Sequence, residues 1–169
     1  MITHDRPIPD AQNEITEAAL ALNPEWIFYV EEDMELPPNI LVDMMLTRSP
    51  VVTADYSLGP QANYSTEPKM CIVRGKKNEI DYCGMGCLLV NAHVFRKLEK
   101  PWFATYQFDG DFVQSGNKRP FGGQDVYFCR KLIDAGIPIV AVGDVCKHYR
   151  VKKYNDAHSN NGVHEIVEI

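Results

Sequence analysis

The sequence lacks several features that mark specialised classes of protein. Its 17 lysines and arginines form no basic block, and a net charge of −6 argues against nucleic acid as a partner. No apolar run approaches the roughly 20 residues of a membrane-spanning helix, and the start has no signal-peptide pattern. The five cysteines are odd in number and scattered, which is typical of a reducing compartment. We therefore expect a cytoplasmic protein without a membrane span.

The remaining composition is that of a globular domain. The chain of 169 residues is 45% hydrophobic and 24% charged, and it contains no internal repeat. This length suits one domain with a substantial core. We predict a single domain over residues 1–150, followed by a polar C-terminal tail over residues 151–169.

The most informative segment is an apolar run that ends in carboxylates. Trp26–Val30 is apolar and is followed directly by Glu31, Glu32 and Asp33. An unbroken apolar run is typical of a strand buried on both faces, and the carboxyl ends of such strands face the crevice where α/β proteins bind ligands. Clustered carboxylates repel one another unless a cation lies between them, which predicts a site for a divalent metal. The alternative is a solvated acidic loop.

Predicted helices and strands alternate along the rest of the chain. Helices are expected from Asp10 to Leu22, from Pro37, from Asn91 to Leu98 and from Gln124 to Ala135, and further strands over 51–55, 87–90 and 137–142. The second helix should bury Leu41, Met44 and Met45, and the last should bury Val126, Cys129 and Ile133. Gly136 should end the last helix. The pattern predicts an α/β domain with a mixed sheet flanked by helices.

Several blocks, taken in order, resemble a known family. They are Phe28–Leu46 with its acidic triplet, Cys83–Val90 with two glycines, Pro101–Phe103, Phe121–Cys129, and a strand ending in His148. This order is similar to that of the GT-A glycosyltransferases, particularly the family-2-like nucleotide-sugar transferases of bacteria and phages. The resemblance spans roughly residues 10 to 150 and implies a GT-A-like fold.

The resemblance implies a metal site that holds a nucleotide-sugar donor. The family's Asp-x-Asp motif corresponds to Glu31, Glu32 and Asp33, with Asp33 at the second acidic position and Glu31 in place of the first. In the family these residues hold Mn²⁺ or Mg²⁺ against the diphosphate of the donor. His148 corresponds to a late metal ligand of the family. A histidine after a strand is otherwise often structural.

The resemblance also implies an acceptor site. Asp125 matches the carboxylate that, in inverting members, takes the proton from the acceptor hydroxyl of a carbohydrate or another alcohol. The residues expected to bind the nucleotide sugar, besides the acidic triplet, are Gly84, Gly86, Trp102 and Gln124. Gln124 replaces a glutamate of the family and can hydrogen-bond a sugar hydroxyl. Gly84 and Gly86 can leave bare backbone for a sugar, or mark a β-bulge. Trp102 can stack on a sugar ring, or belong to the core.

Other interpretations remain open at this stage. The family's N-terminal strand, helix and strand, which bind the nucleobase, have no counterpart here, so the domain looks truncated at its N-terminus. A non-catalytic carbohydrate- or nucleotide-binding module on the same fold is therefore an alternative, and a metal-dependent phosphodiesterase is a weaker one. Self-association is possible but no motif supports it.

A zinc site is a further alternative. It would use Cys83, Cys87, Cys146 and His148, but Cys83 and Cys87 would lie ~13 Å apart on an extended segment, which is too far to share an ion.

Overall fold

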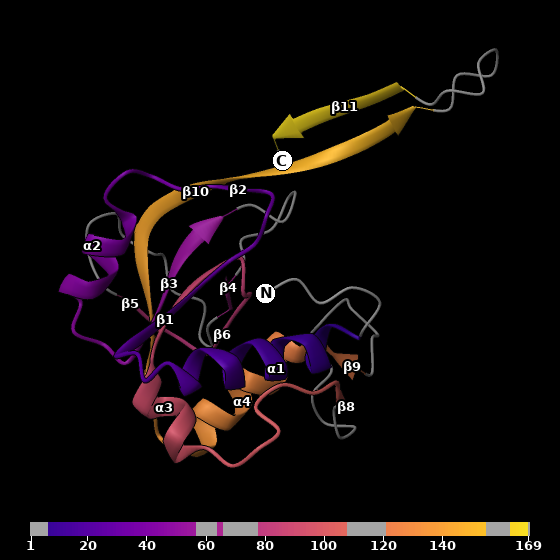
Figure 1. Cartoon of the computed structure of the whole chain (residues 1–169). Coiled ribbons are helices and arrows are strands. Elements are labelled where there is room, and N and C mark those ends of the chain that lie inside the picture. The colour runs from indigo at the N-terminus through magenta and orange to yellow at the C-terminus, as the bar shows by residue number, and fades with distance from the viewer. Residues whose placement is uncertain (1–6, 57–63, 66–77, 108–120, 155–162, 169) are drawn as a thin grey trace.

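The computed structural model describes residues 7–56, 64–65, 78–107, 121–154 and 163–168 (Figure 1). Its helices are α1 (Ile8–Ala21), α2 (Ile40–Leu46), α3 (Ala92–Lys97) and α4 (Gln124–Asp134). Its strands are β1 (Trp26–Val30), β2 (Met34–Glu35), β3 (Val51–Tyr56), β4 (Tyr64–Ser65), β5 (Asn78–Ile80), β6 (Tyr82–Cys83), β7 (Cys87–Asn91), β8 (Tyr106–Gln107), β9 (Phe121–Gly122), β10 (Ile139–Tyr154) and β11 (Val163–Glu168).

A mixed sheet organises the α/β domain. Its strand order is β1-β7-β3-β10-β11, with β2 and β5 also paired to β10. Strand β7 is antiparallel to both β1 and β3, whereas β3 and β10 are parallel. Strands β1, β3 and β10 therefore run in the same direction, and their carboxyl ends share one side of the sheet. This is the side on which open α/β sheets bind ligands.

Strand β1 was predicted to be buried on both faces, but it is only partly buried. It is the first strand in the sheet order, and its last residue, Val30, is 43% exposed. One long side of β1 has no neighbouring strand in the described residues. Of its five residues, Ile27 is buried, and the others are half-buried or exposed. The apolar run thus identified the strand correctly but overstated its burial.

Helices cover both faces of the sheet. One face packs against α1, α3 and α4 through a core that includes Leu20, Phe95 and Phe128. The other face packs against α2, through Ile40 and Met44. Figure 1 shows α1, α3 and α4 gathered together, with α2 apart from them. The expected sheet flanked by helices is confirmed at this level.

The buried faces of two helices were predicted only in part, with Met44 and Cys129 correct. Helix α2 buries Ile40 and Met44, while Leu41 and Met45 are exposed. The helix begins at Ile40 rather than at Pro37, so its buried i, i+4 pair is Ile40 and Met44 rather than Leu41 and Met45. Helix α4 buries Phe128, Cys129 and Leu132 rather than Val126 and Ile133. Phe128 stacks on Phe95 with ring centroids 5.3 Å apart, and this contact sets the face.

The C-terminal segment also differs from the predicted polar tail. Strand β10 continues to Tyr154 and pairs antiparallel with β11, from Tyr149 opposite Glu168 to Tyr154 opposite Val163. Figure 1 shows this hairpin extending away from the rest of the sheet. Polar residues are tolerated in such strands because both faces of a two-stranded hairpin are open to water.

None of the described helices is long and apolar enough to cross a membrane.

Candidate metal centre

The acidic residues after β1 are folded back onto β10. Strand β2 pairs with β10, with Met34 opposite His148. The Tyr149 N–H donates to the Asp33 carbonyl at 3.0 Å, and the Glu31 N–H donates to the Gly86 carbonyl at 3.1 Å. These backbone contacts bring the end of β1 and the middle of β10 together, although more than 100 residues separate them in the chain.

Two carboxylates and an imidazole converge at this point. We call Glu31, Asp33 and His148 the carboxylate–histidine cluster, and their ligand atoms all lie within 4.8 Å of one another. The His148 Nε2 is 3.2 Å from the Asp33 Oδ2, and His148 is 5% exposed. The sequence therefore predicted correctly that these three residues meet, while their role as metal ligands stays a prediction.

The electrostatics of the cluster suit a bound cation. The Asp33 Oδ1 is excluded from water and accepts no hydrogen bond from the described residues. A buried carboxylate oxygen without a partner is costly, and a cation would satisfy it. The pKa of Glu31 is raised by loss of hydration and then by the negative charge of Asp33, although His148 opposes this. Two oxygen donors and one nitrogen donor form a set that divalent metals accept.

Asp125 lies in the first turn of α4 and faces this cluster. Its charge contributes to the raised pKa of Glu31. Burial raises the pKa of Asp125 itself, against the effect of the Val126 N–H, which donates to the Asp125 Oδ1 at 2.8 Å. A Cβ at Gly123 would lie 2.5 Å from the same oxygen, so any other residue at this position would require the carboxylate to shift.

Tyr56 is a residue near the cluster that sequence analysis did not select. It ends β3, is 2% exposed, and its hydroxyl accepts a hydrogen bond from the Gly86 N–H at 2.9 Å. A Cβ at Gly84 would lie 2.3 Å from this hydroxyl, and one at Gly86 2.9 Å from it. Tyr56 thus fills the space that the sequence assigned to a sugar or a bulge. Its position at the carboxyl end of a parallel strand was the available signal.

Other predicted site residues do not join the cluster. Glu32 is exposed and does not belong to the group of converging ligand atoms among the described residues, and Gln124 is half-buried at the start of α4. The zinc alternative finds no support in the described cysteines. The Cys129 thiol lies beside Cys83, donating to its carbonyl at 3.6 Å, while Cys87 interacts with Cys146. Both Cys83 and Cys87 have raised pKa values, which disfavours the thiolate that zinc requires.

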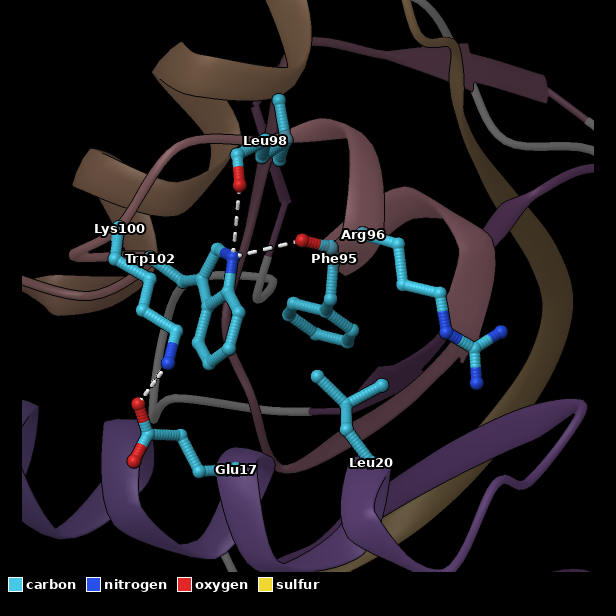
Figure 2. Close-up of a pocket in the computed structure, with 7 residues that line it drawn as sticks. All are labelled: Glu17, Leu20, Phe95, Arg96, Leu98, Lys100 and Trp102. Atoms are coloured by element: carbon cyan, nitrogen blue, oxygen red, sulfur yellow. Dashed lines mark hydrogen bonds and ion pairs between the residues drawn. The ribbon is translucent and has the colours of Figure 1, made fainter.

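Trp102 lies against α1 and α3, away from these carboxylates. Figure 2 shows it in a pocket of about 460 Å³, lined by Glu17, Leu20, Phe95, Arg96, Leu98, Lys100 and Trp102. Trp102 is 3% exposed, and its Nε1–H donates to the carbonyls of Phe95 and Leu98 at 3.0 and 3.2 Å. An indole buried and hydrogen-bonded in this way has the features of the core interpretation.

Comparison with known proteins defines the fold alone. No family model matches the sequence, and no curated protein matches it. Among solved structures, the chain is similar to the viral protein A197 from STIV, with a TM-score of 0.61 and 15% sequence identity. The match covers 88% of this chain and 70% of A197. At this identity the likeness shows a shared α/β fold and carries no statement about activity.

Proposed function

We propose that the protein is a metal-dependent glycosyltransferase of the GT-A type, which moves a sugar from a nucleotide-diphosphate donor to an acceptor hydroxyl with inversion. One observation carries this proposal. The ligand atoms of Glu31, Asp33 and His148 lie within 4.8 Å of one another, with Asp125 close enough to act on the charge of Glu31. This combines a diphosphate-binding metal site with a neighbouring base at the ligand-binding side of the sheet.

Asp33, Glu31 and His148 are the residues that would hold the metal. An imidazole ligand favours Mn²⁺ over Mg²⁺, which prefers oxygen ligands. When bound, the ion would neutralise the donor diphosphate and stabilise the charge that develops on the leaving nucleoside diphosphate. His148 would present Nε2 to the ion, since this is the nitrogen that faces Asp33.

Asp125 would act as the general base. It accepts the proton of the acceptor hydroxyl as that oxygen bonds to the anomeric carbon and the bond to the diphosphate breaks. Burial raises its pKa, and a more basic carboxylate is a better acceptor for a hydroxyl proton. The position of Asp125 at the start of α4, beside the cluster, is the support for this role.

The proposal is tested by calorimetric titration of UDP, GDP, CDP and dTDP with their sugar forms, with and without Mn²⁺. We expect one nucleotide to bind, and its binding to require Mn²⁺. Incubation of the matching sugar nucleotide with simple sugar acceptors should then release the nucleoside diphosphate. Metal-dependent binding without turnover would favour the non-catalytic binding module, and hydrolysis of simple phosphodiesters would favour a phosphodiesterase. Absence of both Mn²⁺ and nucleotide binding would refute the metal centre.

A further inference from the structure

Tyr56 is packed between the elements that supply the proposed metal ligands. Its hydroxyl is held by the Gly86 N–H at 2.9 Å, and the carbonyl of the same Gly86 accepts from the Glu31 N–H at 3.1 Å. A Cβ at Gly86 would also lie 3.2 Å from the Glu31 Oε2. The hydroxyl of Tyr56 is therefore linked to the backbone of Glu31 through Gly86, and the Glu31 carboxylate lies beside that same glycine.

The ring of Tyr56 contacts the other side of the cluster. It meets the imidazole of His148 edge to face, with ring centroids 5.6 Å apart and an interplanar angle of 84°. Both residues are buried, so the tyrosine ring limits the rotation of the imidazole about its side-chain bonds. His148 in turn approaches the Asp33 carboxylate at 3.2 Å.

We propose that Tyr56 is a positioning residue that fixes two of the three metal ligands, Glu31 through its hydroxyl and His148 through its ring. This inference rests on the proposed function, because it assigns Tyr56 to the same metal centre. Residues that orient metal ligands affect metal affinity without touching the ion, and their loss typically weakens binding by about 10- to 100-fold. Tyr56 contributes no ligand atom and acts entirely through its neighbours.

The first test is a graded series at this position. Tyr56→Phe removes the hydroxyl and keeps the ring, and Tyr56→Leu removes both. We expect Mn²⁺ affinity, measured from the paramagnetic resonance signal of free Mn²⁺, to fall about 10-fold for Tyr56→Phe and further for Tyr56→Leu. The matched control is Tyr29→Phe, which removes a buried hydroxyl that is bonded to Thr16 at 2.6 Å and does not contact the cluster. Tyr29→Phe should bind Mn²⁺ like the parent.

The second test uses the close fit between Tyr56 and Gly84. A Cβ at Gly84 would be 2.3 Å from the Tyr56 hydroxyl but 3.4 Å from the ring carbon beneath it, which is ordinary contact. Gly84→Ala should therefore displace Tyr56 and weaken Mn²⁺ binding in the parent. In the Tyr56→Phe background the same substitution should have little further effect. Additive losses would show that Gly84 acts independently of the hydroxyl and would count against the inference.

A readout without metal separates this inference from the proposed function. The imidazole resonances of His148, assigned by comparison with His148→Gln, should be single and sharp in the parent and split or broaden in Tyr56→Leu as the ring gains rotamers. The Gly86 amide should exchange faster with solvent in Tyr56→Phe. If the parent binds no Mn²⁺, the proposed function fails, and these signals still decide the role of Tyr56. Unchanged resonances, or unchanged Mn²⁺ affinity in a parent that binds it, would overturn the inference.

Discussion

Two neighbouring clusters, one that includes Tyr29 of β1 and one that begins just after β1 at Glu31, differ in how well their polar groups are hydrogen-bonded. Tyr29 belongs to the aromatic cluster, which we define as Tyr29, Phe95, Trp102, Phe103 and Phe128. There the polar groups of Tyr29 and Trp102 have partners. The Asn13 side chain accepts from the Trp102 N–H at 3.0 Å and donates to the Phe103 carbonyl at 2.8 Å. Lys100 pairs with Glu17 at the edge of the same region (Figure 2).

The carboxylate–histidine cluster, two residues further along the chain, leaves its polar groups poorly satisfied. Asp33 keeps a buried oxygen without a hydrogen bond from the described residues, and Glu31 faces the like charges of Asp33 and Asp125. Satisfied polar groups stabilise a fold, whereas unsatisfied ones are retained where a ligand completes them. The contrast separates a cluster whose polar groups are paired from one whose proposed role is to bind a cation. Four substitutions test this division, beginning with the one expected to affect metal binding most.

The largest effect on metal binding is expected for Asp33→Asn. The substitution keeps the size of the side chain but removes the charge that a divalent ion needs, so Mn²⁺-dependent nucleotide binding should fall by roughly 100-fold or more. Titration calorimetry with Mn²⁺ and the selected nucleotide measures this loss. Glu35→Gln is the control, because Glu35 is an exposed carboxylate that contacts Tyr149 and Lys147 instead. Equal binding by parent and Asp33→Asn would remove Asp33 from the site.

Asp125→Asn should abolish proton transfer while leaving metal binding intact. We expect kcat to fall by about 10²- to 10⁴-fold. In the parent, activity should rise with pH as Asp125 loses its proton, with a midpoint above the ordinary aspartate pKa of about 3.9, because burial raises this pKa. A pH–rate profile of both proteins checks this. Turnover by Asp125→Asn with the parent profile would assign the base elsewhere.

Trp102→Ala tests the other side of the comparison. Loss of a buried tryptophan should lower the free energy of unfolding by about 3–5 kcal/mol, because it leaves a cavity and removes the donor for two backbone carbonyls. The Mn²⁺ affinity of the folded fraction should stay at the parent value. Urea unfolding and Mn²⁺ titration measure the two quantities separately. Weaker Mn²⁺ binding in a folded Trp102→Ala protein would contradict the division between the clusters.

Glu31→Gln should weaken metal binding yet slightly stabilise the metal-free protein. A carboxyl whose pKa is raised by folding ionises first in the unfolded chain, so stability declines as the pH rises from the unfolded to the folded pKa and stays lower above it. Glutamine avoids this loss, and we expect a gain of less than about 1 kcal/mol at neutral pH because Glu31 is exposed. The gain should disappear in acid. Thermal unfolding at both pH values, without metal, would detect the difference.

The sequence predicted the residues that meet at the site better than it predicted the packing around them. An apolar strand ending in carboxylates and a strand leading to a histidine are local patterns. Strands β1 and β10 run in the same direction, and the pairing of β2 with β10 then joins Asp33 to His148. Asn91 was also expected to start a helix, and its side chain accepts from the His93 N–H at 3.0 Å. These features depend on short-range rules that a sequence shows directly.

What could not be predicted depends on long-range contacts. The buried face of α4 is set by the stacking of Phe128 on Phe95, and no periodicity in α4 encodes that partner. The two glycines were visible, but the reason for them is Tyr56, which lies about 30 residues earlier in the chain. The hairpin of β10 and β11 was missed because its polar residues resemble those of a loop.

The irregular register of β10 lies next to the proposed metal centre and divides the strand into two parts. Pairing with β3 shifts between Val142 and Val145, and such bulges bend a strand. Asp33 and His148 both lie on the outer side of this bend, joined through β2, whereas Glu31 is tied to Gly86 on the sheet side. The register shift therefore separates the part of β10 that pairs regularly with the sheet from the part that holds His148 beside Asp33.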